Sequence, residues 1–140
     1  MIFVDTSVVV AASTVLDRRH DVCVDVLAAA DKGGGCCSLH SLAELFNVLS
    51  GRPVPLRLSP RDAAKVVAHT AQRLKAISLT ASEYVEAVEG LAGLGHSGGM
   101  IYDALILGCA RKAKARRIYT LNPRHFRLVA PDLAQKILEP

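Results

Sequence analysis

Three acidic residues and one amide stand beside apolar segments that are far apart in the chain. Asp5 directly follows the first apolar segment and Glu44 follows the second, whereas Asp103 opens a long apolar segment and Asn122 follows the last. Carboxylate and amide oxygens suit hard cations such as Mg²⁺ or Mn²⁺ and suit zinc poorly. Carboxylates gathered in a partly buried crevice repel one another, and a divalent cation would relieve that repulsion. We therefore predict that these four residues form a catalytic metal site, with the three acids as ligands and Asn122 as a candidate fourth.

Two of these acids also have a purely structural alternative at a helix start. Glu44 is the third residue after Ser41, a spacing that matches a capping box worth about 1 kcal/mol. Asp103 in the first turn of a helix would interact favourably with the helix dipole. Neither alternative requires a metal.

The other two candidates have structural alternatives of the same kind. Asp5 would cap the turn at Thr6 and Ser7, and Asn122 directly before Pro123 is typical of an N-cap followed by proline. The case for a metal site therefore depends on all four residues sharing one place in the fold.

Short apolar segments alternate with helical patterns along the whole chain, which indicates a parallel sheet flanked by helices. In such a sheet ligands bind beyond the carboxyl ends of the strands, and all four candidates are expected at this edge. The expected strands are 1–4, 36–39, 76–79 and 117–121. The expected helices are one with Val22, Val26 and Ala29 or Ala30 on one face that ends at 32–35, then 41–50, 60–74, 80–94 and 100–113.

Composition favours one folded domain that covers residues 1–140. The chain is 51% hydrophobic and 21% charged, and no polar linker divides it, so disorder and a second domain are not expected. Aromatic residues make up only 4% and tryptophan is absent, which disfavours a surface on which bases stack.

The sequence also favours a soluble, cytoplasmic protein. No segment offers eighteen apolar residues without charge, and the opening stretch lacks the basic region of a signal peptide. The four cysteines lack the spacing of zinc sites and of disulfide frameworks, so we expect them to be buried and reduced. They are Cys23, Cys36, Cys37 and Cys109.

A basic cluster near the carboxyl-terminal third gives the chain much of its formal net charge of +4. Such a cluster is compatible with binding to a polyanion such as RNA. The alternative is that these cations stabilise the carboxyl-terminal end of a helix and are otherwise solvated. The residues are Arg111, Lys112, Lys114, Arg116 and Arg117, with Arg124 close behind.

Four sequence blocks, in this order and spacing, resemble the PIN-domain nucleases and, within that family, the VapC toxins of bacterial toxin–antitoxin pairs. The resemblance extends over the whole chain. The blocks are Ile2-Phe3-Val4-Asp5-Thr6-Ser7, Ala43-Glu44, Ile101-Tyr102-Asp103-Ala104-Leu105-Ile106 and Tyr119-Thr120-Leu121-Asn122-Pro123-Arg124-His125-Phe126.

The resemblance implies a three-layer α/β/α fold with a mainly parallel central sheet. It also implies a Mg²⁺- or Mn²⁺-dependent endoribonuclease that forms a homodimer and is neutralised by a cognate antitoxin in a hetero-oligomer. Asp5, Glu44 and Asp103 match the family's acidic metal-binding positions, and Thr6 and Ser7 would support them through hydroxyl contacts. Many members carry a fourth acid where Asn122 stands.

Two other functions remain open from the sequence. One is a catalytically silent PIN-like module in which the basic cluster only binds RNA. The other is a metal-dependent phosphohydrolase that acts on a small phosphate ester. The residues are compatible with either one or two bound cations. Phe126 is expected in the core. The position of His125 does not define its role, and a solvated or capping role is favoured over catalysis.

Overall fold

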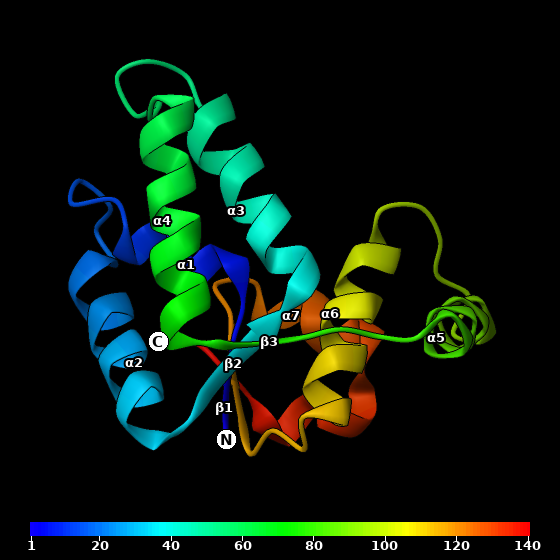
Figure 1. Cartoon of the computed structure of the whole chain (residues 1–140). Helices are drawn as coiled ribbons and strands as arrows, with labels where there is room; N and C mark the ends of the chain where they lie inside the picture. The colour runs from blue at the N-terminus through cyan, green and yellow to red at the C-terminus, as the bar shows by residue number, and fades with distance from the viewer.

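A five-stranded parallel sheet forms the centre of the computed structural model, which describes residues 1–140 (Figure 1). The strand order is β3-β2-β1-β4-β5, so β1 lies in the middle. The strands are β1 (Ile2–Val4), β2 (Gly35–Ser38), β3 (Lys75–Ile77), β4 (Arg117–Tyr119) and β5 (Ile137–Leu138). The helices are α1 (Thr6–Ala12), α2 (His20–Gly33), α3 (Leu39–Gly51), α4 (Pro60–Arg73), α5 (Ala81–Gly93), α6 (Met100–Lys112), α7 (Pro123–Val129) and the 3₁₀ helix η1 (Pro131–Lys136).

Successive side chains of each strand point to opposite faces and build two separate cores. Phe3 belongs with α6 and α7 in one core, whereas its neighbour Val4 belongs with α1 to α4 in the other. Cys36 and Cys37 divide in the same way. Because both faces of the sheet are covered, the central strand β1 is apolar along its whole length, as is usual for parallel sheets.

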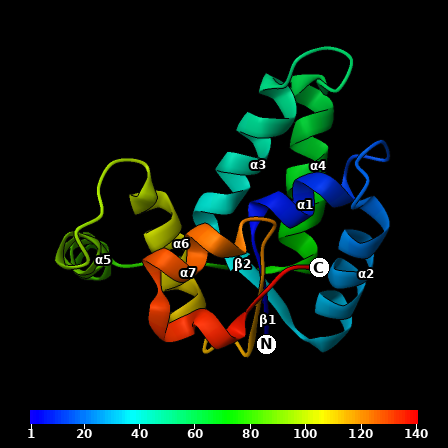
Figure 2. The same cartoon turned by 180° about the vertical axis from the view of Figure 1, so that it is seen from behind.

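The helices make two layers around the sheet, as the front and back views show (Figures 1 and 2). Helices α1, α2, α3 and α4 cover one face, and α6 and α7 cover the other. Helix α5 packs against α6 at the periphery. The expected three-layer α/β/α fold with a parallel sheet is confirmed.

Several elements differ from those expected from the sequence. Residues Thr6–Ala12 form a separate helix, α1, where only a polar turn was expected before a single helix. Helix α3 begins at Leu39 with Ser38 as its N-cap, two residues before the expected start at Ser41. The short edge strand β5 was not expected, because a two-residue strand carries too little sequence pattern to be recognised.

Three other helix ends are capped by local contacts or backbone geometry. Ser59 caps α4 by accepting a hydrogen bond from the backbone of Asp62. Thr80 and Glu83 form a complete capping box at the start of α5. Gly34 ends α2 with a φ of +78°, in the left-handed region that favours glycine.

The sheet, α5 and α7 surround the apolar helix α6 and bury most of its apolar side chains. All four cysteines are buried and free, as expected. Phe126 is in the core. None of the helices has both the length and the apolar character that crossing a membrane requires.

Gly35 is the glycine that the packing of β2 requires. A Cβ at this position would lie 2.6 Å from Cδ2 of Leu74 and 2.7 Å from Cβ of Ala30. We predict that Gly35→Ala lowers the free energy of unfolding by about 1 to 3 kcal/mol, because overpacking a filled core forces its neighbours apart. Chemical denaturation measures the change.

Gly33→Ala is the matched control, because a Cβ there meets no atom within 4 Å. This variant should be as stable as the wild type or slightly more stable, since alanine favours the helix. Equal stability of the two variants would contradict the close packing at Gly35.

Candidate metal centre

The four residues singled out by the sequence line one cavity of about 370 Å³ at the carboxyl edge of the sheet. Asp5 follows β1, Glu44 lies on α3 after β2, Asp103 lies in the first turn of α6, and Asn122 follows β4. The structure therefore brings together side chains from four separate parts of the chain. The lining also includes Thr6, Ser7, Asp17, Arg19, Ile106, Leu121 and Phe126.

Asp5 lies at the centre of the site and is only 6% exposed. Its Oδ2 accepts hydrogen bonds from Oγ of Ser7 at 2.6 Å and from Oγ1 of Thr120 at 2.9 Å, with a longer one from the Ser7 backbone at 3.4 Å. The backbone hydrogen bond from Ser7 makes Asp5 the N-cap of α1, so the capping role considered for Asp5 is observed as well. No hydrogen bond occupies the other oxygen, Oδ1, which remains available as a ligand.

Glu44 approaches the cavity from α3 and accepts a hydrogen bond from Oγ1 of Thr6 at 2.6 Å. The expected capping box with Ser41 is wrong, because α3 begins earlier and Ser38 caps it by accepting from the Ser41 backbone at 2.9 Å. Glu44 lies in the second turn, beyond the free backbone groups of the helix start. Its contact with Thr6 directs it toward Asp5 instead.

Asp103 and Asn122 complete the edge of the cavity without fixed partners. Neither side chain makes a hydrogen bond within the chain, although the backbone of Asn122 donates to Oγ1 of Thr120 at 3.0 Å. The expected capping role of Asn122 before Pro123 is not observed, since its side chain makes no cap hydrogen bond. Asp103 does stand where it complements the α6 dipole.

Asp5, Glu44 and Asp103 repel one another and have no cationic side chain paired with them. None of the five ion pairs in the structure includes Asp5, Glu44 or Asp103. Burial raises the pKa of Asp5, and the charge of Glu44 raises it further against the lowering effect of its hydroxyl donors. Burial raises the pKa of Asp103 to about 6, with Asp5 and Glu44 adding to the rise and His125 opposing it.

The donor chemistry and the uncompensated charge fit a divalent cation at this site. The three carboxylates are not already closed around an ion position, since no group of three possible ligands is close enough for that. Thr6 holds Glu44, while Ser7 and Thr120 hold one oxygen of Asp5. Binding would therefore need side-chain rotation within the cavity, and no change in the fold.

Thr120 is a residue of the site that sequence reasoning did not single out. It is fully buried, donates to Asp5 and accepts from the Asn122 backbone, so it connects the ends of β1 and β4. The feature that could have identified Thr120 is the parallel pairing of Val4 with Tyr119, which places the next residues, Asp5 and Thr120, side by side. That register becomes visible only once the strand pairing is known.

The basic cluster lies away from the acids. Arg111 and Lys112 are in the last turn of α6, roughly 12 Å along the helix from Asp103, and pair with Asp132 and Glu83. Lys114, Arg116 and Arg117 follow at the amino edge of the sheet, where β4 begins. Only Arg124, in the first turn of α7, lies at the same edge as the acids.

A larger cavity of about 510 Å³ lies between α5, α6 and η1, but its chemistry is different. Its charged side chains include Arg111, Lys112, Glu83 and Asp132, which form the two ion pairs just described. The charges of these four side chains are already balanced, so the cavity does not contain a group of carboxylates whose repulsion a bound cation would relieve.

We predict that Asp103→Asn stabilises the metal-free protein at pH 7. In the wild type the folded pKa of about 6 exceeds the ordinary value of 3.8, so stability falls as the pH rises from about 4 through 6. The variant cannot ionise and avoids this loss, which we expect to be about 1 to 2 kcal/mol after solvent screening. Thermal melts in chelator between pH 4 and 8 measure it.

Glu89→Gln is the matched control, because this exposed carboxylate on α5 makes no hydrogen bond or ion pair. Removing its charge should not reproduce the gain in stability that is expected of Asp103→Asn at pH 7. Adding Mn²⁺ at pH 7 should raise the melting temperature of the wild type more than that of Asp103→Asn. A stability gain from Asp103→Asn that is already complete at pH 4 would contradict the account.

Comparison with known proteins agrees with this arrangement. The PIN domain family model matches residues 2–130. The chain is 35% identical over 113 residues to Ribonuclease VapC27 of Mycobacterium tuberculosis (strain ATCC 25618 / H37Rv), which covers 80% of this chain and 78% of the relative. The family match spans β1 to β4, α1 to α7 and the four candidate residues of the cavity. The chain therefore belongs to the PIN-domain family, as one of its VapC-type members.

Proposed function

We propose that the protein is an endoribonuclease that hydrolyses RNA phosphodiester bonds with Mg²⁺ or Mn²⁺ held by Asp5, Glu44 and Asp103. The observation that carries the proposal is that these three carboxylates line one cavity and none of them is paired with a cationic side chain. The similarity to a ribonuclease supports RNA as the substrate. A bound divalent cation would activate water and neutralise charge that develops on the phosphate.

The chain's own residues supply position and charge at this site. Hydroxyl donors hold Asp5 and Glu44 in the metal-free protein, and metal binding would exchange the contact of Glu44 with Thr6 for the cation. The backbone around Asn122 is fixed through Thr120, which places the amide at the mouth of the cavity. No serine, histidine or cysteine nucleophile is needed, and the cysteines lie buried in the cores.

A catalytically silent RNA-binding module is the alternative. It would gain nothing from three uncompensated acids, which repel a polyanion and cost stability. The similarity to a ribonuclease favours RNA over a small phosphate ester as the substrate.

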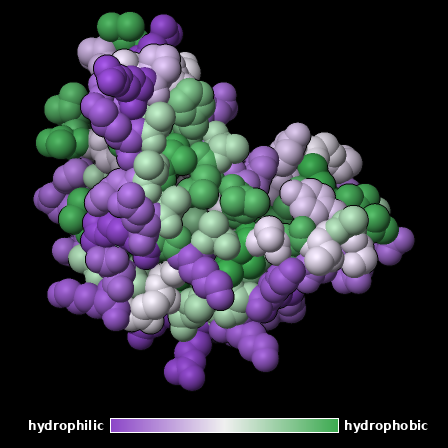
Figure 3. Space-filling model, viewed as in Figure 1, coloured by the Kyte–Doolittle hydropathy of each residue, from purple (hydrophilic) through white to green (hydrophobic).

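We further propose that the protein acts in the cytoplasm as the toxin of a type II pair, bound and neutralised by a cognate antitoxin, and that it forms a homodimer. Exposed apolar side chains support protein partners. Val15 and Leu16 on the α1–α2 loop are each 80% exposed, and Val54 at the α3–α4 tip is 78% exposed. Figure 3 shows hydrophobic surface at this end of the molecule.

The purified protein should cleave total RNA at discrete sites in Mg²⁺ and should not cleave in excess EDTA. Asp103→Asn should reduce the rate at least tenfold while remaining folded, because it removes one ligand charge and keeps the side chain's shape. Mapping of new 5′ ends measures both effects, with Glu89→Gln as the control variant. Full activity in EDTA would refute the metal mechanism.

We predict that Asn122→Asp raises the affinity of the RNA-free protein for Mn²⁺, since an added carboxylate acts directly on the cation. Asn122→Ala should cost little stability, because the side chain caps nothing. Calorimetric titration and thermal melts measure the two effects. Unchanged affinity in Asn122→Asp, with a loss of about 1 kcal/mol in Asn122→Ala, would place Asn122 outside the site.

A further inference from the structure

One ion pair in the cavity is explained by neither metal binding nor the packing of the cores. Asp17 and Arg19, from the loop between α1 and α2, line the same cavity as Asp5, Glu44 and Asp103. Arg19 is the one cation among the lining residues. Its charge is directed to Asp17 and not to the three acids, which therefore remain free for a cation.

Asp17 accepts hydrogen bonds from two nitrogens of the Arg19 guanidinium and leaves the third nitrogen free. Nε donates to Oδ1 at 3.2 Å and Nη2 donates to Oδ2 at 3.3 Å, while the Arg19 backbone also donates to Oδ1 at 2.8 Å. The third nitrogen, Nη1, makes no hydrogen bond, and the side chain is 39% exposed. An arginine held in this way presents a preoriented donor and a positive charge to a phosphate.

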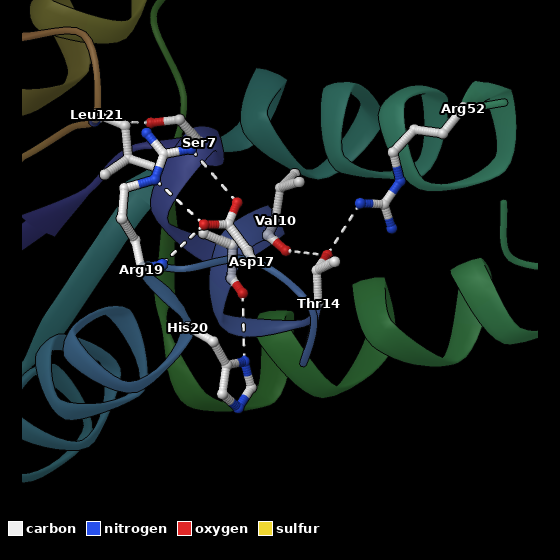
Figure 4. A network of polar contacts seen from close by, with 9 residues as sticks. Ser7, Val10, Thr14, Asp17, Arg19, His20, Arg52 and Leu121 are labelled. Carbon is white, nitrogen blue, oxygen red and sulfur yellow. Dashed lines mark hydrogen bonds and ion pairs between the residues drawn. The ribbon is translucent and has the colours of Figure 1, made fainter. Parts of the chain in front are cut away.

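The loop that carries this pair is braced from both sides (Figure 4). Oγ1 of Thr14 donates to the Val10 carbonyl at 2.7 Å and accepts from Nη1 of Arg52 on the α3 side at 2.9 Å. The Asp17 backbone donates to the Thr14 carbonyl at 2.8 Å. These bonds fix Asp17 relative to α1 and α3, so the position of Arg19 is set by the fold.

The direction of Arg19 also fits a role toward substrate. Figure 4 shows its side chain extending from the loop to the side of the cavity where Ser7 and Leu121 lie. Both residues line the cavity, and Oγ of Ser7, which donates to Asp5, accepts from the Leu121 backbone at 3.0 Å. Arg19 therefore lines the same cavity as the acids, on the side where Ser7 and Leu121 lie.

We propose that Arg19, positioned by Asp17, binds a phosphate of the RNA next to the one that is cleaved. The proposal rests on the ribonuclease function proposed above. In this arrangement Arg19 is a substrate-binding residue and Asp17 is a positioning residue. The basic cluster at the far edge of the sheet need not reach the cavity for RNA to be held there.

The test compares Arg19→Ala with Arg18→Ala. Arg18 is the exposed neighbour on the same loop, lines no part of the cavity and makes no hydrogen bond or ion pair, so both variants lose the same charge. We expect Arg19→Ala to raise KM roughly tenfold with kcat within about twofold, as for the loss of a charged hydrogen bond. Arg18→Ala should keep both constants near those of the wild type.

Binding of a labelled single-stranded RNA in EDTA separates recognition from cleavage. Arg19→Ala should weaken binding and reduce the slope of log K against log salt by about 0.7, the value for one lost phosphate contact. Arg19→Lys keeps the charge but cannot grip Asp17 and a phosphate together, so it should lie between Arg19→Ala and the wild type.

Asp17→Asn distinguishes positioning from simple electrostatics. Removing a negative charge from the cavity would by itself tighten RNA binding. Loss of the hydrogen bonds that orient Arg19 should instead weaken RNA binding and raise KM. We expect KM to rise at least threefold at an unchanged melting temperature. Tighter binding in Asp17→Asn would overturn the positioning role.

The proposal fails if Arg19→Ala and Arg18→Ala have equal KM values and equal salt slopes while the wild type cleaves RNA. It also fails if Arg19→Ala weakens only the binding of an acidic protein partner. A wild type that neither binds nor cleaves RNA would instead refute the ribonuclease function. Should Arg19→Ala not fold, Arg19→Lys and Asp17→Asn provide the same comparison.

Discussion

The site depends on keeping the buried carboxylate of Asp5 ionised without a cationic side chain beside it. Burial raises its pKa, and hydroxyl groups from Ser7 and Thr120 counter that effect by donating to one oxygen. Those hydroxyls in turn accept from the backbones of Leu121 and Asn122. The same bonds that hold Asp5 therefore join the end of β1 to the segment after β4, so the fold and the acidic site are built from one network.

The alternation of strands and helices made the parallel sheet predictable, because each apolar segment is short and each helix has a recognisable start or end. Helix α1 was missed because Val8, Val9 and Val10 are β-branched residues, which favour strands when read locally. Packing against α2 and α3 overrides that preference. The start of α3 was missed by two residues because Ser38 and Ser41 are both good caps, and only the strand end decides between them.

Asp5 and Glu44 were predictable because each follows an apolar segment, and Asp103 because it lies in the first turn of the apolar helix. In a parallel sheet, the strand ends and the starts of the following helices meet at one edge. Thr120 and Arg19 were not predictable, because their roles depend on contacts between distant or irregular segments. Thr120 reaches Asp5 through the pairing of β4 with β1, and Arg19 reaches the cavity through a loop of irregular structure. The basic cluster was a candidate RNA-binding site because of its charge. Most of it lies at the opposite edge of the sheet from the acids, because α6 runs from the acidic edge to the other one.

A crystal structure with Mn²⁺, recorded at the manganese absorption edge, tests the central claim most directly. The account predicts an anomalous peak in the cavity, coordinated by oxygens of Asp5, Glu44 and Asp103, with Glu44 turned away from Thr6. The peak should disappear in Asp5→Asn crystals soaked in the same way. A saturating soak that leaves Glu44 on Thr6 and shows no anomalous peak among the three carboxylates would contradict the account.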